Sequence, residues 1–575
     1  MQRYRTIAGG LLLLALVAAG GFFLFNRNPL DPVEPAAEAW FTDVTDSAGL
    51  DFLHQAGNRG EYWMPRINGS GVALFDFDGD DRLDIYLLNF DGPESKAVNR
   101  LYRNLGNGRF RDVTEGSGLG IAGWCAGVVV GDVDNDGQPD VVVTEYNGVR
   151  IFRNLGAGRF EDVTAESGLK NPLWSASASF LDYDRDGFLD LVIVNYVDYD
   201  PSRECLGLTG RPDYCGPQAF PPTVSKLFRN LGPKGGRPRF QDTTVESGLA
   251  SAPGPGLGVY CADFDGDGWQ DILVANDLKA NHLWINQKNR TFREEALQRG
   301  IALDSVGVAM SGMGIAPGDV DNDGLFDVYI THLTTESNTL WKQGPSRGRF
   351  RDSSAASGLL ATNWRATGWG TVMADFDRDG WNDLAVVNGR VTRHGGQPDP
   401  ALGTQFQHYG ERNQFFRNEG TGRLADRSEA EVAFCGAPNM ARGLAVGDLD
   451  NDGSLDLVVT TIANRARVLR NTAAHTGHWL QLNIVDPRYR RVAYGAEVVV
   501  RVADKKLLRI VQPCGSFLCN NDPRIHFGFG PHEACDSIDV LWPDGLRERF
   551  PGGPADRTVT LKRGEGTPLI AAVKP

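Results

Sequence analysis

The sequence lacks the patterns by which several common classes of protein are identified. Long helical periodicity is hard to find in its 575 residues, whereas glycine is abundant at 70. This combination predicts an all-β protein with many tight turns. No basic patch with interleaved aromatic residues appears, so no nucleic acid is expected as a partner. No Ser/His/Asp or Cys/His arrangement and no pair of metal-ligand histidines is found, and no catalytic residue is assigned.

What the sequence does contain is a nine-residue acidic loop that occurs seven times. One copy runs from Asp263 to Asp271, with carboxylates at positions 1, 3, 5 and 9 and glycine at position 6. Six copies keep this glycine, and the first has Asp81 in its place. The carboxylates at the four positions are, loop by loop, Asp76, Asp78, Asp80 and Asp84; Asp132, Asp134, Asp136 and Asp140; Asp182, Asp184, Asp186 and Asp190; Asp263, Asp265, Asp267 and Asp271; Asp319, Asp321, Asp323 and Asp327; Asp375, Asp377, Asp379 and Asp383; and Asp448, Asp450, Asp452 and Asp456.

These loops are predicted to bind Ca²⁺, up to seven ions in all. Alternate carboxylates around a glycine turn can close on one hard cation, and the carbonyl of position 7 would add an oxygen. An EF-hand has the same opening but needs a glutamate at position 12 and flanking helices. Position 12 is apolar in every copy, and apolar runs flank each loop, which indicates strand–loop–strand hairpins. The alternative is a set of acidic turns that bind nothing.

The net charge of −15 agrees with such metal sites. Four positions in each of seven loops hold 28 of the 73 acidic residues. Seven Ca²⁺ ions would bring the net charge to about −1. The acidity is therefore better explained by metal sites than by attraction to cationic partners.

The N-terminal residues 1–25 predict export. Arg3 and Arg5 precede Thr6 to Phe25, an uncharged stretch long enough to span a bilayer as a helix. The arginines favour an N-terminus on the inside, with the rest of the chain on the periplasmic or extracellular side. A cleaved secretory signal is the alternative, and it would give a secreted protein. Residues 26–39 are interpreted as a linker.

A second repeated phrase follows the loops. One copy is Leu101-Tyr-Arg-Asn104, a glycine turn, Phe110 to Thr114, and Ser117 to Leu119. A strand, a turn and another strand fit this phrase. Each loop with its phrase thus gives four strands, and seven such units over residues 40–472 predict a seven-bladed β-propeller. Because the N-terminal residues 41–50 carry only the second half of the phrase, this strand is predicted to complete the seventh blade beside residues 466–470.

The loops resemble the FG-GAP and VCBS repeats of integrin α-subunit propellers, and loops and phrases together are similar to the cartilage acidic protein family. This resemblance implies calcium-stabilised blades, a role in extracellular binding or adhesion, and no established enzyme activity. Residues 473–575 are predicted to form a small β-sandwich of five or more strands. Gly495-Ala496, Asn521 to Gly530 and Trp542 to Gly545 resemble the ASPIC/UnbV domain, and His526 is expected to be a packed strand residue.

Two long insertions, residues 196–225 and 389–412, interrupt the same connection within a blade. Because strand direction alternates, they are expected on the face opposite the acidic loops. Eight cysteines agree with export, and the local candidates for disulfides are Cys205 with Cys215 and Cys514 with Cys519. Cys125 and Cys261 are expected to be buried thiols.

Two functions remain open from the sequence. The first is a non-enzymatic, calcium-dependent binding or adhesion module that holds an unknown protein or glycan at the insertion face. The second is an exported propeller enzyme, for example one acting on glycans, with a site in the central channel formed by His54, His332, Arg390 or His394. The side chains that line the central channel would distinguish the two functions. A cluster of acids, bases and histidines favours the enzyme, whereas an apolar or glycine-lined channel favours the binding module.

Overall fold

The computed structural model describes residues 38–56, 62–362, 364–474 and 477–569. The chain divides into Met1–Glu38 and Ala39–Pro575, and all the described helices and strands belong to the second unit. The predicted export segment and nearly all of the linker lie outside the described residues. Among the residues that are described, none of the helices has the length and apolar character needed to cross a membrane.

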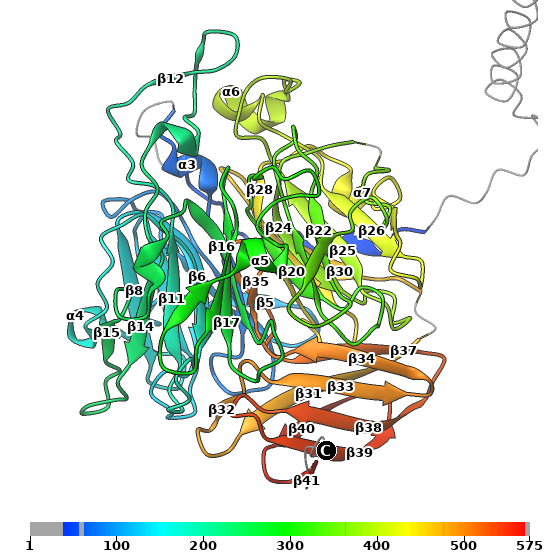
Figure 1. The fold of residues 1–575 in the computed structure, drawn as a ribbon. Coiled ribbons are helices and arrows are strands. Elements are labelled where there is room, and N and C mark those ends of the chain that lie inside the picture. Colours follow the sequence, from blue (N-terminus) through cyan, green and yellow to red (C-terminus); the bar gives the residue numbers. More distant parts are fainter. Residues whose placement is uncertain (1–37, 57–61, 363, 475–476, 570–575) are drawn as a thin grey trace, which may run out of the picture. The chain divides into compact units, whose positions relative to one another are not determined.

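The unit is all-β and consists of many small sheets (Figure 1). Seven sheets follow one another along the chain, and each is a four-stranded antiparallel meander in its core. Their strands are β2 (Val72–Phe75), β3 (Asp84–Leu87), β4 (Arg100–Asn104) and β5 (Phe110–Asp112); β6 (Cys125–Gly131), β7 (Asp140–Glu145), β8 (Gly148–Asn154) and β9 (Phe160–Asp162); β10 (Ser175–Leu181), β11 (Asp190–Asn195), β14 (Lys226–Asn230) and β15 (Phe240–Asp242); β16 (Gly256–Ala262), β17 (Asp271–Asn276), β18 (His282–Asn286) and β19 (Phe292–Glu294); β20 (Ile315–Gly318), β21 (Asp327–Ile330), β22 (Thr339–Gln343) and β23 (Phe350–Asp352); β24 (Gly368–Ala374), β25 (Asp383–Asn388), β26 (Gln414–Asn418) and β27 (Leu424–Asp426); and β28 (Ala441–Gly447), β29 (Asp456–Thr461), β30 (Arg467–Asn471) and β1 (Phe41–Asp43).

The first strands of these sheets lie next to one another in chain order. Strand β2 contacts β6, β6 contacts β10, and the series continues through β16, β20 and β24 to β28, which contacts β2 again. Each acidic loop joins the first and second strands of a sheet, as a strand–loop–strand hairpin. The sheets pack face to face, and most residues of their first and second strands are buried.

The predicted pairing of the N-terminal strand is present. β1 pairs with β30 in antiparallel register, with Phe41 opposite Asn471. The carboxylate of Glu431, which is fully buried, accepts hydrogen bonds from the backbone N–H groups of Trp40 at 2.9 Å and Phe41 at 3.2 Å. The first described strand therefore supplies the outer strand of the last sheet and covers its edge.

Helices are short and lie between sheets. They are α2 (Thr45–Ala48), α3 (Pro65–Asn68), α4 (Thr164–Ser167), α5 (Ala296–Arg299), α6 (Gly403–Phe406) and α7 (Val432–Cys435), with 3₁₀ turns η1 (Pro217–Ala219), η2 (Leu249–Ser251) and η3 (Pro400–Leu402). Helices α2, α4 and α5 occupy the same place in the repeated phrase, and each ends at a glycine in the left-handed conformation.

The C-terminal residues form two further sheets, shown orange to red in Figure 1, whose buried apolar residues form one core with those of the second and third sheets. One contains β31 (His478–Asp486), β32 (Arg491–Val492), β37 (Ile525–Gly530) and β40 (Arg557–Lys562); the other contains β33 (Glu497–Val502), β34 (Lys505–Ile510), β38 (Ala534–Leu541), β39 (Arg547–Pro554) and β41 (Thr567–Pro568). The five strands predicted from the sequence are present, and β32, β37, β39 and β41 are additional. The predicted domain boundary at residues 472 and 473 falls between β30 and β31.

One segment of the C-terminal part, residues 512–521, lies among the first strands of the seven sheets. It contains the two-residue strands β35 (Cys514–Gly515) and β36 (Cys519–Asn520), and β36 pairs in parallel with β2. Its residues hydrogen-bond to the first strand of every sheet, through Leu74, Val130, Phe180, Cys261, Ile315, Thr371 and Val446. Phe517 and Leu518 at its tip are buried. The space that the first strands surround is thus filled by the chain itself.

The cysteine predictions are partly confirmed. Cys205 and Cys215 form a disulfide across the small hairpin of β12 (Cys205–Leu206) and β13 (Pro212–Asp213). The suggested pair Cys514 and Cys519 is wrong, since both thiols are free. In the hairpin Cys514 lies opposite Asn520, and the two cysteines pack into different hydrophobic cores. Cys125 and Cys261 are buried thiols, as expected.

Candidate metal centres

The acidic loops share one backbone-to-carboxylate hydrogen-bond pattern. In the loop that begins at Asp263, this carboxylate accepts the N–H groups of Gly266, Asp267 and Gly268 at 2.7, 3.1 and 2.8 Å. The position-5 carboxylate, Asp267, accepts the N–H of Trp269 at 2.9 Å. The bond from position 7 to position 5 recurs in all seven loops. The loop is therefore folded by the same side chains that are predicted to be ligands.

Positions 4 and 6 of each loop adopt the left-handed conformation. Position 6 is glycine in six loops and Asp81 in the first, where φ is 62°. Position 4 is glycine, asparagine or arginine, with Asn135 at φ 59° as an example. These two reversals turn the carboxylates of positions 1, 3 and 5 toward one another, and residues other than glycine accept that conformation at some cost.

The position-9 aspartates are buried and bound by the backbone. Asp271 accepts the N–H of Phe264 at 2.9 Å on one oxygen and that of Asn286 at 2.8 Å on the other. The same two bonds recur at the other six position-9 aspartates. Each position-9 carboxylate therefore joins its own loop to the third strand of the same sheet.

The acidic loops contain buried carboxylate oxygens without partners, which fit a bound cation. In five of the seven loops one oxygen of the position-3 carboxylate is buried and has no hydrogen-bond partner among the described residues: Asp78, Asp184, Asp321, Asp377 and Asp450. Carboxylate oxygens of positions 1, 3 and 9, or of 1, 3 and 5, converge within 4.8 Å in the first five loops. A buried anionic oxygen without a partner is costly, and a bound cation would remove that cost. Oxygen donors of this number and charge suit Ca²⁺.

Burial and mutual repulsion raise the pKa values of these carboxyls. Burial, together with repulsion from neighbouring carboxylates, raises the pKa of Asp84 to about 8 and that of Asp132 to about 7. Burial likewise raises the pKa of Asp375 to about 8. Several carboxylates cannot share one buried site as anions unless a positive charge joins them.

Part of that positive charge comes from a basic residue on the third strand of the sheet. This role was not predicted from the sequence. Arg229 donates from Nε to Asp184 at 2.6 Å and from Nη2 to Asp186 at 2.8 Å. Arg153 binds positions 3 and 5 of its loop in the same way, and Arg103, Lys342, Arg417 and Arg470 pair with position 3 of theirs. Each pairs with one oxygen of the position-3 carboxylate, so the other oxygen remains for a metal. The arginine of the repeated Arg-Asn phrase was the signal for this role.

The asparagine of the same phrase connects neighbouring sheets. The side-chain amide of Asn154 donates to Pro139 O in its own sheet at 3.2 Å and to Phe77 O, in the preceding loop, at 3.1 Å. Asn104, Asn230, Asn286 and Asn418 make the same pair of bonds, and Asn471 makes the bond to the preceding loop. Six of the seven loops are thus held in place by the sheet that follows them.

The acidic loops lie together on one face. Position-4 side chains donate to the position-6 carbonyl of the next loop, as Asn135 does to Gly187 at 3.0 Å and Asn322 to Gly380 at 3.0 Å. Asn451 of the seventh loop donates to Asp81 of the first at 3.2 Å. These bonds would not form if the loops pointed in different directions.

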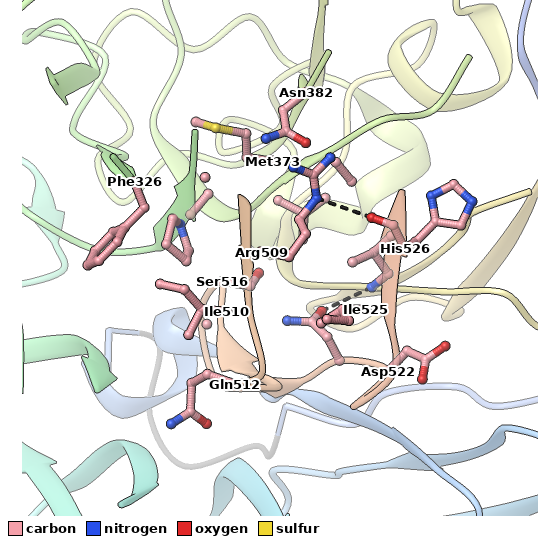
Figure 2. A pocket seen from close by; sticks show the side chains of 18 of the residues that line it. Phe326, Met373, Asn382, Arg509, Ile510, Gln512, Ser516, Asp522, Ile525 and His526 are labelled. Atoms are coloured by element: carbon pink, nitrogen blue, oxygen red, sulfur yellow. Dashed lines mark hydrogen bonds between the residues drawn. The ribbon is translucent and has the colours of Figure 1, made fainter. Parts of the chain in front are cut away.

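The C-terminal domain packs on this face. Arg524 Nη2 donates to Asp448 O at 3.1 Å, and the Nε2 atom of His526 lies 2.9 Å from Gly453 O. Near the fifth and sixth loops, Figure 2 shows Arg509 and His526 beside Met373 and Asn382, around a cavity of about 150 Å³. Arg509 Nε donates to His526 O at 3.1 Å. His526 is a buried strand residue, as expected from the sequence.

The two insertions meet each other. The backbone N–H of Arg393 donates to Asp213 at 2.8 Å, and Tyr409 OH donates to the other oxygen of the same carboxylate at 2.7 Å. The disulfide hairpin carries Leu206 and Leu208, which are 69% and 85% exposed. The insertions therefore form one surface, with an exposed apolar tip.

The residues suggested for a central catalytic site have separate partners. His54 hydrogen-bonds to Ser70 and to the backbone of Ala463, and burial lowers its pKa to about 3. His332 is buried beside Trp341. Arg390 pairs with Glu411 and donates to the carbonyl of His394. The channel itself holds residues 512–521, whose tip is apolar.

Comparisons with known proteins agree with this organisation. The profile of the FG-GAP-like repeat matches residues 76–143, 132–193, 226–330 and 396–459, and the ASPIC and UnbV profile matches residues 487–568. Cartilage acidic protein 1 of Mus musculus is 27% identical over 312 residues, which are 53% of this chain and 44% of that protein. The Homo sapiens protein is 26% identical over 312 residues, 53% of this chain and 43% of its own length. The chain thus covers less than half of these relatives.

Among solved structures, an Agrocybe aegerita lectin that recognises non-reducing terminal N-acetylglucosamine is 16% identical. Its match covers 70% of this chain and 94% of the lectin chain, with a TM-score of 0.39. With so low a TM-score, we infer nothing about this chain from the lectin. The repeat and domain matches show that FG-GAP-like repeats are followed by an ASPIC and UnbV domain in this chain, which over about half of its length is similar to cartilage acidic protein 1.

Proposed function

We propose that this chain is an exported, seven-bladed calcium-binding β-propeller that acts as a binding or adhesion module. In this proposal the seven sheets are the blades, and each acidic loop holds one Ca²⁺ ion through positions 1, 3, 5 and 9. Bound calcium would neutralise the clustered carboxylates and thereby stabilise the loops. The N-terminal segment would keep the protein at the membrane, or release it if cleaved.

The observation that carries the metal proposal is the buried, unpartnered oxygen of the position-3 aspartates, such as Asp78 and Asp377. A loop that served only as a turn would not leave this oxygen without a partner, because exposure to water would be cheaper. Metal analysis of protein purified without chelator tests the proposal. About seven calcium ions per chain are expected, whereas one ion or none would contradict it.

We place the partner, a protein or a glycan, at the surface formed by the two insertions. Loops on a rigid scaffold are common binding elements, and the Cys205–Cys215 disulfide limits the freedom of one of them. The apolar residues Leu206 and Leu208 are exposed there without covering any core. We prefer the binding module to a central-channel enzyme because residues 512–521 fill the channel, with the buried apolar residues Phe517 and Leu518 at their tip.

The partner proposal is tested with the Cys205→Ser/Cys215→Ser double variant and with Leu206→Ser/Leu208→Ser. Capture of exported or surface-bound material by immobilised protein should weaken in both variants, while calcium content stays the same. Capture equal to that of the unmodified protein in both variants would refute the assignment of this surface.

A further inference from the structure

A second cleft lies on the acidic-loop face, where the C-terminal domain does not pack directly on the propeller. Its volume is about 590 Å³. The first and second acidic loops line one wall, and strands β31 and β40 with the turn after β31 line the other. Clefts of this size hold small organic ligands.

Several polar side chains on both walls of this cleft have no hydrogen-bond partner among the described residues. Asp81, Arg490 and Asn483 line the cleft, and among the described residues their side chains have no hydrogen bond or ion pair. The side chains of Gln138 and Thr560, which also line the cleft, have no hydrogen-bond partner among the described residues either. Other charged groups that line the cleft are paired, as Arg524 is with Asp522 at 2.8 Å. Groups left free on facing walls are available to a ligand.

Asp81 is also conspicuous for its conformation. It occupies position 6 with a φ of 62°, where the six other loops have glycine. The loop geometry therefore does not require an aspartate, which tolerates the left-handed region less well than glycine. Position 6 is not one of the predicted metal-ligand positions. Its carboxylate instead lines the cleft.

We propose that this cleft binds a neutral oligosaccharide. Carboxylate, amide, guanidinium and hydroxyl groups together donate and accept hydrogen bonds, as the vicinal hydroxyls of a sugar require. Leu83, Pro139 and Val485 supply apolar surface for the C–H faces of the ring. This site lies on the acidic-loop face and goes beyond the partner surface proposed above.

The charge of the lining favours a neutral ligand. The lining holds four carboxylates and four guanidinium groups: Asp76, Asp81, Asp132 and Asp522, and Arg82, Arg490, Arg491 and Arg524. An anionic sugar would meet the carboxylates and a cationic ligand the guanidinium groups, and either would lose solvation at one wall. An extended peptide would need a sheet edge for backbone pairing, whereas the side chains of β31 and β40 line this cleft.

The experiment uses the full exported chain on an array of neutral, sialylated and sulfated oligosaccharides, with calcium present. Binding to one or more neutral oligosaccharides is expected, followed by affinity measurement with that sugar. Asp81→Gly restores the glycine of the other loops, and Arg490→Asn suits the φ of 55° at that residue. Each should weaken binding about tenfold or more. Calcium content and thermal stability should stay unchanged, because neither residue is a predicted ligand.

Asp504→Gly is the matched control, since it removes an exposed carboxylate in the turn between β33 and β34, away from the cleft. It should bind as the unmodified protein does. The proposal is overturned if no neutral oligosaccharide binds, if only charged sugars bind, or if Asp81→Gly and Arg490→Asn both retain full affinity.

Discussion

The Asp184→Asn variant separates the metal role of a position-3 carboxylate from its structural role. The side chain of Asp184 is 1% exposed, with one oxygen bound by Arg229 at 2.6 Å and the other buried without a partner. An amide keeps the shape but removes the negative charge and half of the oxygen donors. Calcium content should fall by about one ion per chain, because the third loop loses a central ligand.

The effect on stability should depend on calcium. Calcium modules outside the cell have dissociation constants on the order of 10⁻⁴ M. At 10 mM Ca²⁺ such a site adds about 2.7 kcal/mol to the free energy of unfolding. Isothermal denaturation should therefore show a loss that is larger by about this amount in calcium than in chelator. The loss that persists in chelator measures the pairing with Arg229 and with Arg290, whose Nε atom lies 3.0 Å from the same oxygen.

Asp198→Asn is the matched control, because Asp198 is exposed and lies outside the acidic loops. It should leave both calcium content and stability unchanged. If Asp184→Asn keeps the full calcium content, or destabilises the protein equally in calcium and in chelator, the assignment of position 3 as a metal ligand is incorrect.

Three further predictions follow from the described contacts. Deleting residues 40–50 should lower the melting temperature more than deleting residues 26–39, since only the first deletion exposes the edge of β30; equal melting temperatures would refute the closure. Asn154→Ala removes two amide hydrogen bonds to carbonyls, so denaturation should show a loss of about 2–3 kcal/mol, and a loss under 0.5 kcal/mol would contradict the inter-sheet role. Burial raises the pKa of Cys514 to about 12, and its thiol should stay neutral and resist iodoacetamide at pH 8 until the protein is denatured; intact mass measures this, and labelling of the native protein would disprove it.

The parts of the structure that the sequence predicted are those encoded over short distances. The acidic loops join strands that pair within about a dozen residues, so the residues between Asp263 and Asp271 determine the turn and its flanking hairpin. The pairing of β1 with β30 joins the two ends of the repeat region, and it was predicted from the phase of the repeat, because a half unit at one end must complete a half unit at the other. The periodicity of the repeat thus allowed one long-range contact, the pairing of β1 with β30, to be predicted.

Long-range contacts without a repeat could not be predicted in this way. Residues 512–521 bind all seven sheets, but nothing in their sequence distinguishes them from a loop of the C-terminal domain. The spacing of Cys514 and Cys519 suggested a local disulfide, whereas their register in a hairpin buried among seven strands directs the thiols to separate cores. Likewise, the role of Arg229 became visible only when the third strand was seen beside its loop.

These contacts indicate different uses for the acidic-loop face and the insertion face. On the acidic-loop face, the C-terminal domain takes the carbonyl groups of Asp448 and Gly453 as hydrogen-bond acceptors, so much of that face serves to hold the molecule together. The insertion face has no such cover among the described residues and instead presents a hairpin held by a disulfide. Leu206 and Leu208 contribute little free energy to folding, because they bury little apolar surface at that tip. Their burial against a partner would recover that free energy, which is why the insertion face, and not the loop face, is expected to carry the main partner.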